Sequence, residues 1–224
     1  MGGRGRSSGK GLVGGGGFVT PGALGGSAGS ASAGPDHAEV PKEEIQRAVD
    51  AAIARMPARV RTLLESQGTK THVLTVKEAV KLAGPDAKNW RGFYAPKSRQ
   101  AHVIVDNFQH AGGGRNSGMT ALHELGHAYD YQRTPGTRLT DTPGFKAALA
   151  KDQKNLQRVK LSAGQRERMQ YLHYPAGSRA KEIFAETFAA IYGVGRPKPA
   201  KQWNNSQRIK TAYPNVTKFI KGLK

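Results

Sequence analysis

Residues 121–130 read ALHELGHAYD, in which two histidines lie four residues apart and a glutamate directly follows the first. Side chains at positions i and i+4 project from one face of a helix, so His123 and His127 can direct two imidazole nitrogens at one metal ion. Glu124 projects to a neighbouring position, where it can take a proton from a metal-bound water. The competing interpretation is an ordinary amphipathic helix with two histidines, and the strict spacing favours the metal site.

A third ligand must come from a small pool of residues. Catalytic zinc takes three protein ligands and one water, and the chain has no cysteine, only seven histidines and sixteen acidic residues. Residues 181–193, KEIFAETFAAIYG, predict a mostly apolar helix in which acids are costly to bury unless they are paired or bind metal. We therefore predict Glu182 as third ligand and Glu186 as the acceptor of the other ring proton of a ligating histidine. The alternatives are a solvated acidic edge and His173.

Together, HELGHAYD and KEIFAETFA resemble the gluzincin metallopeptidases related to anthrax lethal factor, the family that includes the Pro-Pro endopeptidases. The resemblance covers about residues 100–193 and is specific in the two motifs and their order. It implies the zinc ligands His123, His127 and Glu182 and the general base Glu124. It also implies a tyrosine shortly before the third ligand that supports the oxyanion, for which Tyr174 is the nearest match and Tyr171 the alternative. The implied reaction is peptide hydrolysis by a zinc-activated water.

The remaining patterns predict an α+β fold that is mostly helical, with a short sheet beside the active-site helix, and the resemblance implies that this is a small zincin-like metallopeptidase domain. The predicted helices are one within 41–68 with a break near Pro57, 77–84, a helix capped by Asn116 or Ser117 and running through Tyr129, 142–158, 162–172, and one from Ser178 to Gly193 or Gly195. The predicted strands are 71–76 and 101–108. The resemblance implies that the strand at 102–107 holds an extended protein or peptide substrate by edge pairing.

Fourteen of the 29 glycines fall within residues 1–34, where few side chains could build an apolar face. We predict that residues 1–38 are a disordered Gly/Ser-rich leader and that 39–224 form one domain, expected to be a monomer. No apolar run is long enough to span a bilayer, and the N-terminus lacks a secretory signal. The leader and the toxin-like motif favour secretion without a classical signal peptide, as an effector or toxin delivered into a host or target cell. Housekeeping and phage-encoded proteases are the alternatives.

The net charge of +19 would attract nucleic acid, anionic membranes or acidic proteins. After Glu186 the chain has no acidic residue but eight lysines and arginines, interleaved with Trp203, Tyr213 and Phe219. Such a basic segment with aromatics can bind nucleic acid, so a nucleic-acid-associated protease is the second hypothesis. The third is a non-catalytic binding module with a structural zinc site, against which the intact Glu124 argues.

Overall fold

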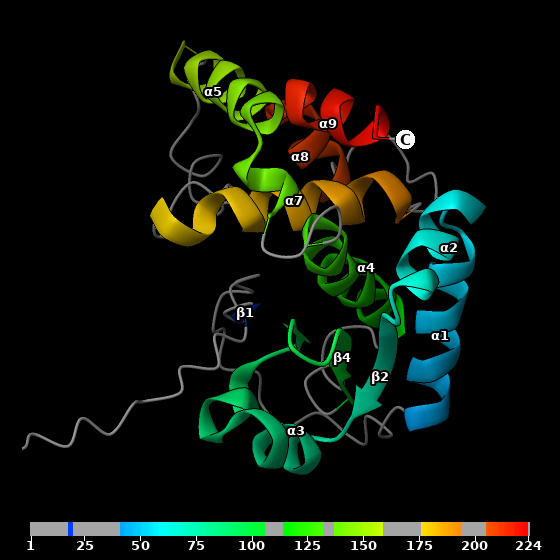
Figure 1. The fold of residues 1–224 in the computed structure, drawn as a ribbon. Coiled ribbons are helices and arrows are strands. Elements are labelled where there is room, and N and C mark those ends of the chain that lie inside the picture. The colour runs from blue at the N-terminus through cyan, green and yellow to red at the C-terminus, as the bar shows by residue number, and fades with distance from the viewer. Residues whose placement is uncertain are drawn as a thin grey trace, which may run out of the picture.

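A computed structural model describes residues 41–105, 114–131, 137–158, 176–193 and 205–223, together with the backbone of Phe18–Val19. These residues form mostly helices around one small mixed sheet (Figure 1), so the α+β prediction is confirmed at this level. Of the leader, only Phe18–Val19 is described, and the predicted boundary near residue 38 lies outside the described residues.

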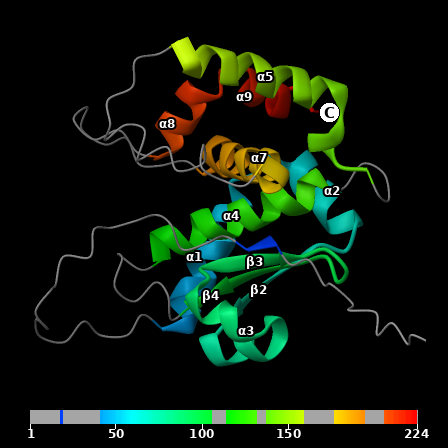
Figure 2. The same cartoon turned by 90° about the vertical axis from the view of Figure 1, so that its left-hand side faces the viewer.

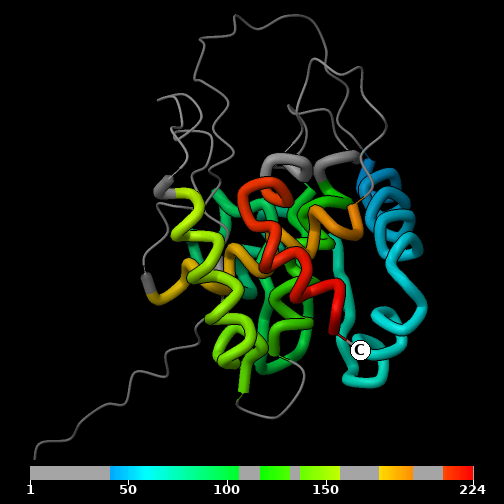
Figure 3. Tube along the Cα trace, turned by 90° about the horizontal axis from the view of Figure 1, so that it is seen from above, coloured from blue at the N-terminus to red at the C-terminus, as the bar shows by residue number. Residues whose placement is uncertain are grey.

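The elements stack in layers, which Figures 1 and 2 show from two sides. Above the sheet the helices are α4 (Gly114–Asp130), then α7 (Ala176–Tyr192), then α5 (Pro143–Arg158), α8 (Asn205–Ala212) and α9 (Pro214–Lys221). Below the sheet lies α3 (Val76–Ala83), and α1 (Lys42–Ala54) and α2 (Ala58–Ser66) flank α4. The view from above in Figure 3 shows α5, α8 and α9 lying over α7.

The sheet has the strand order β1-β3-β4-β2. The strands are β1 (Phe18–Val19), β2 (Lys70–Leu74), β3 (Gly92–Ala95) and β4 (Gln100–Ile104). β4 pairs in parallel with β2 and antiparallel with β3, and β1 adds antiparallel to β3. Both sides of β4 are therefore occupied by neighbouring strands. The expectation that the strand at 102–107 pairs with a substrate at a sheet edge is wrong for residues 102–104, because β4 lies in the interior of the sheet, and residues 106–107 lie outside the described part of the chain.

The two faces of the sheet pack against different helices. Toward α1 and α4, the buried side chains are Val73, Val103 and Val105 of the sheet region with Ile45, Val49 and Ala121 of the helices. Toward α3 and the short 3-10 helix Pro85–Asn89, Phe93 and Ile104 pack with Ala79 and Ala87. A capping box fixes the start of α3, since the Glu78 amide donates to Thr75 Oγ1 and the Thr75 amide donates to Glu78 Oε2.

The predicted break near Pro57 is confirmed, because α1 ends at Ala54 and α2 begins at Ala58. The predicted helix start at Asn116 or Ser117 is wrong: α4 begins at Gly114, and both residues lie in its first turns. β3 was not predicted, since its four residues GFYA are too short to show an alternating pattern. The predicted helix at 162–172 lies outside the described residues.

The C-terminal helices α8 and α9 belong to the core. Tyr213 is fully buried and Phe219 packs against the main apolar cluster, so neither is available to stack on nucleic acid bases. Trp203 lies outside the described residues, and the nucleic-acid hypothesis stays a prediction. Within the described ranges, every helix is too short or too polar to cross a bilayer.

Candidate metal centre

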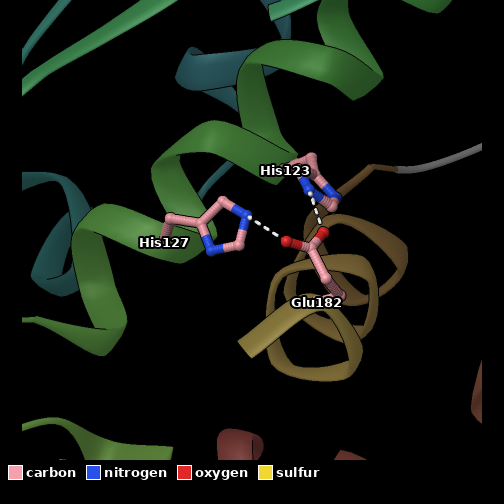
Figure 4. Close-up of side chains that lie close together, drawn as sticks. All are labelled: His123, His127 and Glu182. Atoms are coloured by element: carbon pink, nitrogen blue, oxygen red, sulfur yellow. Dashed lines mark ion pairs between the residues drawn. The ribbon is translucent and has the colours of Figure 1, made fainter. Parts of the chain in front are cut away.

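Two helices from different layers bring the predicted ligands together (Figure 4). His123 and His127 lie one turn apart on α4, and Glu182 approaches both from α7. His123 Nε2 lies 3.3 Å from Glu182 Oε2, and His127 Nε2 lies 3.6 Å from Glu182 Oε1. All three side chains are at most 5% exposed. The helical spacing of the histidines thus produces one buried group of nitrogen and oxygen donors.

The arrangement of donor atoms fits a metal ion. The three ligand atoms lie within 4.8 Å of one another, the one such group of three or more His, Asp or Glu residues among those described. Two tetrahedral ligands at normal zinc bond lengths are about 3.3–3.6 Å apart. The distances from Glu182 to the two histidines match this spacing and exceed a normal N–H···O hydrogen bond of roughly 2.7–3.2 Å. Two imidazoles and one carboxylate are also the donor set of many catalytic zinc sites.

Gly126 allows α4 and α7 to approach closely enough for Glu182 to reach the histidines. A Cβ atom at Gly126 would lie 2.8 Å from Ala185 Cα and 3.2 Å from Phe188 Cβ. The small residue on α7 that faces Gly126 is Ala185, three positions after Glu182. The glycine inside the HELGH motif therefore has a packing role, and α4 and α7 make extensive contact along this line.

Glu124 is fully buried on the side of α4 that faces the sheet. A Cβ atom at Gly92, the first residue of β3, would lie 3.2 Å from Glu124 Cγ and 2.7 Å from Thr120 Cγ2. Gly92 is thus required for the close approach of β3 to α4. The consequence is a carboxylate next in sequence to His123, enclosed between the helix and β3.

Glu186 contacts the other nitrogen of His123, with Glu186 Oε1 3.4 Å from His123 Nδ1. This leaves Nε2 of His123 directed toward Glu182, as in metal sites where a carboxylate orients a ligating histidine. Three of the sixteen acidic residues of this basic chain, Glu124, Glu182 and Glu186, lie around two histidines. The local negative charge favours a cation.

The pKa values of the group reflect this mutual arrangement. Burial lowers the pKa of His123, but Glu182 and Glu186 outweigh that effect and hold it well above its usual range. Burial lowers the pKa of His127 and leaves its ring neutral, as a metal ligand must be. Burial raises the pKa of Glu182, but both histidines together bring it to about 2. A divalent cation would compete with protonation of these histidines, since metal binding displaces protons from its ligands.

The C-terminal end of the motif helix is anchored by Asp130. Its Oδ1 accepts a hydrogen bond of 2.7 Å from the Thr140 amide, and its Oδ2 accepts one of 2.9 Å from the Thr140 hydroxyl. Arg138 donates to the Tyr131 hydroxyl and lies over the ring of that tyrosine. These contacts connect α4 to the 3-10 helix Leu139–Asp141 and hold the last turn of α4 in place.

The structure brings His123, His127, Glu182 and Glu186 together in the predicted combination, with Glu124 beside them. Tyr174, Tyr171 and the alternative ligand His173 lie outside the described residues, so the predicted oxyanion support stays a prediction. The sequence interpretation missed the packing roles of three small residues, Gly92, Gly126 and Ala185. A glycine in the interior of a helix was the available signal for Gly126.

Comparison with protein-family models, with curated proteins and with solved structures finds no match for this chain.

Proposed function

We propose that this protein is a zinc-dependent endopeptidase of zincin-like fold, with His123, His127 and Glu182 as zinc ligands and Glu124 as general base. The observation that carries the proposal is the convergence of three buried donors from α4 and α7, next to a fully buried glutamate. A structural metal site has no use for such a carboxylate, whereas hydrolysis requires a base beside the metal. Two imidazoles and a carboxylate suit zinc better than magnesium or calcium, which prefer oxygen donors.

Each side chain has a distinct part in the proposed reaction. Zinc, when bound, supplies Lewis acidity that activates a water molecule and polarises the carbonyl of the scissile peptide. Glu124 takes the proton that is released and returns it to the leaving amine nitrogen. Glu186 holds His123 in the orientation that directs Nε2 at the site. The proposed substrate is a protein or peptide, and Tyr174, or Tyr171, is the proposed donor to the oxyanion.

The test combines metal content with activity. Zinc is measured by elemental analysis in the wild type and in the variants His123→Ala, Glu182→Ala and Glu124→Gln, and each protein is incubated with a mixed peptide library whose cleavage is mapped by mass spectrometry. We expect one zinc in the wild type, severe loss of zinc in the first two variants, and a zinc-loaded but inactive Glu124→Gln protein. Circular dichroism of each variant verifies the fold.

Three outcomes would separate the alternatives. Cleavage by Glu124→Gln at the wild-type rate would refute the role of Glu124. Tightly bound zinc with no cleavage of any peptide would support the non-catalytic binding module. If His123→Ala and Glu182→Ala contain as much zinc as the wild type, the metal centre itself would be refuted.

We also propose secretion without a classical signal peptide and delivery into a target cell. The proposal is supported by the composition of residues 1–38 and by the absence of cysteine, which leaves no disulfide to lose in a reducing cytosol. A reporter protein fused to residues 1–38 tests it, since retention of the reporter inside the producing cell would contradict it.

A further inference from the structure

The outer edge of β3 is occupied by a segment from far away in the sequence. β3 pairs with β4 through all four of its residues, and on its other side Phe18 pairs with Tyr94 and Val19 with Phe93. Successive residues of an antiparallel strand direct their N–H and C=O groups alternately to one neighbour and the other. The two residues of β1 therefore cover the middle of the outer edge of β3, which a four-residue strand would otherwise leave open.

This edge lies directly beside the candidate site. Gly92 begins β3 and packs against Glu124, and Phe93, which pairs with Val19, is the next residue. Adjacent strands are about 4.8 Å apart, so β1 runs one strand spacing from the strand that touches the proposed general base. Figures 1 and 2 both show β1 on the side of β3 that faces α7, the helix that carries Glu182. An extended chain at this place lies where a peptide would approach the site.

We propose that the Phe18–Val19 segment is an intramolecular competitor of the substrate, because it occupies the outer edge of β3, where an extended polypeptide could otherwise pair. The part that concerns the substrate rests on the proposed peptidase function. A segment that adds to a sheet edge is bound through main-chain hydrogen bonds, so such an edge can bind segments of different sequence. The opposite edge of the sheet is β2, which contacts α1 and α3, whereas the motif helix α4 packs on β3 and β4.

The competition is reversible for an energetic reason. Two paired residues form few backbone hydrogen bonds, each with a net value of about 0.5–1.5 kcal/mol, so a substrate that pairs over a longer stretch can displace them. The segment is nevertheless effective against dilute substrates, because a tethered segment has an effective concentration on the order of millimolar.

The experiment uses the full chain with Phe18→Pro and Val19→Pro together, because proline has no N–H to donate to a strand. The matched control is Ser30→Pro with Ala31→Pro, which changes the same Gly/Ser-rich part of the chain by the same number of prolines. Amide hydrogen exchange of residues 92–95 reports the docking. We expect at least tenfold faster exchange in the Phe18/Val19 variant and wild-type exchange in the control.

Binding of a labelled peptide, GGGGFVTPGA, reports the competition without any need for catalysis. We expect it to bind the Phe18/Val19 variant at least tenfold more tightly than the wild type or the control, and to restore protection of residues 92–95. On an unfolded protein substrate, the same variant should show a KM lowered about threefold or more with kcat unchanged, whereas a structural strand would change kcat and thermal stability instead.

The two proposals fail in different ways. Unchanged exchange of residues 92–95, or equal peptide binding by the wild type and the Phe18/Val19 variant, would overturn the docking proposal whatever the activity. Faster exchange and tighter peptide binding, together with no cleavage by any zinc-loaded form, would uphold the docking strand and refute the peptidase.

Discussion

Gly126 determines how closely α4 and α7 approach, and therefore whether one carboxylate can reach both histidines. Its two closest neighbours across the interface are backbone atoms of Ala185, which cannot rotate away as the end of a side chain can. The residue that most affects the candidate metal centre without binding metal is thus a glycine inside the metal-binding motif.

For Gly126→Ala we expect weaker zinc binding and a less stable protein. A methyl group 2.8 Å from Ala185 Cα must push the helices apart, which increases the distance from Glu182 to the histidines. Disturbance of the groups that support a metal site typically weakens metal affinity about 10–100-fold, and overpacking costs about 1–3 kcal/mol. Competition with a zinc-binding dye and chemical denaturation measure the two effects.

Gly177→Ala is the matched control for this prediction. Nothing lies within 4 Å of a Cβ at Gly177, which is on α7 like Ala185. Alanine stabilises a helix by up to about 1 kcal/mol relative to glycine, so Gly177→Ala should keep or raise stability and leave zinc affinity unchanged. Wild-type zinc affinity in Gly126→Ala would show that the close packing of α4 and α7 is not required.

At the scale of the secondary-structure elements, α9 is held by a side chain from α5. Asp152 is fully buried and caps the first turn of α9, accepting hydrogen bonds from the Asn215 amide at 3.1 Å and the Val216 amide at 2.9 Å. A carboxylate at a helix N-terminus satisfies amides that have no partner within the helix and interacts favourably with the helix dipole. Together with a third hydrogen bond from the Asn215 side-chain amide to Asp152, these contacts connect α9 to α5 in addition to the apolar packing between the two helices.

Asp152→Ala should lower the free energy of unfolding by about 2–4 kcal/mol, because it leaves two amides without their acceptor in a buried place. Asp152→Asn keeps one acceptor oxygen and should cost less. Asp50→Ala removes an exposed acid on α1 and should change stability by less than about 0.5 kcal/mol. Denaturation curves of the three variants check the order, and equal stability of Asp152→Ala and Asp50→Ala would refute the capping role.

Several amphipathic helices were predictable from the sequence because each carries its own signal, such as the spacing of Ile45 and Val49 on α1 or Pro57 before the start of α2. β3, α8 and α9 were not predicted, since a strand of four residues and helices of eight residues contain few repeats of a pattern. The edge role of residues 102–107 was taken from the resemblance, and it failed for β4 because β3, which was not predicted, lies beside it.

The ligand residues of the site could be predicted from the sequence, whereas the crossing of the two helices that carry them could not. The pairing of His123 with His127 follows from helical geometry alone, and the choice of Glu182 follows from the cost of burying an acid without a partner. The crossing of α4 and α7 depends on Gly126 meeting Ala185, a contact between residues 59 positions apart in sequence (185 − 126 = 59). No periodicity in a single sequence encodes that contact.

At the scale of the whole molecule, Asp130 makes stability depend on pH. Burial raises the pKa of Asp130 to about 6, although hydrogen bonds from Thr140 act in the opposite direction. A carboxyl group whose pKa is higher in the folded protein stabilises it at low pH, and this contribution is lost as the pH rises from about 4 to 6. The shift from 3.8 to about 6 corresponds to about 3 kcal/mol.

Asp130→Asn should remove this loss, since an amide stays neutral and still accepts a hydrogen bond from the Thr140 amide. Between pH 4 and pH 7, the free energy of unfolding of the wild type should fall by about 2–3 kcal/mol relative to that of Asp130→Asn. Comparing the two proteins cancels the opposite effect of Glu182, whose low pKa is lost only toward pH 2. Urea denaturation across this pH range measures the difference, and parallel curves would contradict the assignment.

Zinc should stabilise the whole molecule, because its proposed ligands come from two helices that belong to different layers. His123 and His127 lie on α4 over the sheet, and Glu182 lies on α7 beneath the C-terminal helices. Free zinc at a thousand times its Kd adds about 4 kcal/mol, which in a domain of this size is roughly 8–16 °C in Tm. A chelator should lower the Tm of the wild type and of Glu124→Gln by this amount, and zinc but not magnesium should restore it. The Tm of Glu182→Ala should be the same with and without chelator. If neither chelator nor zinc changes the Tm of the wild type, the metal centre would be refuted.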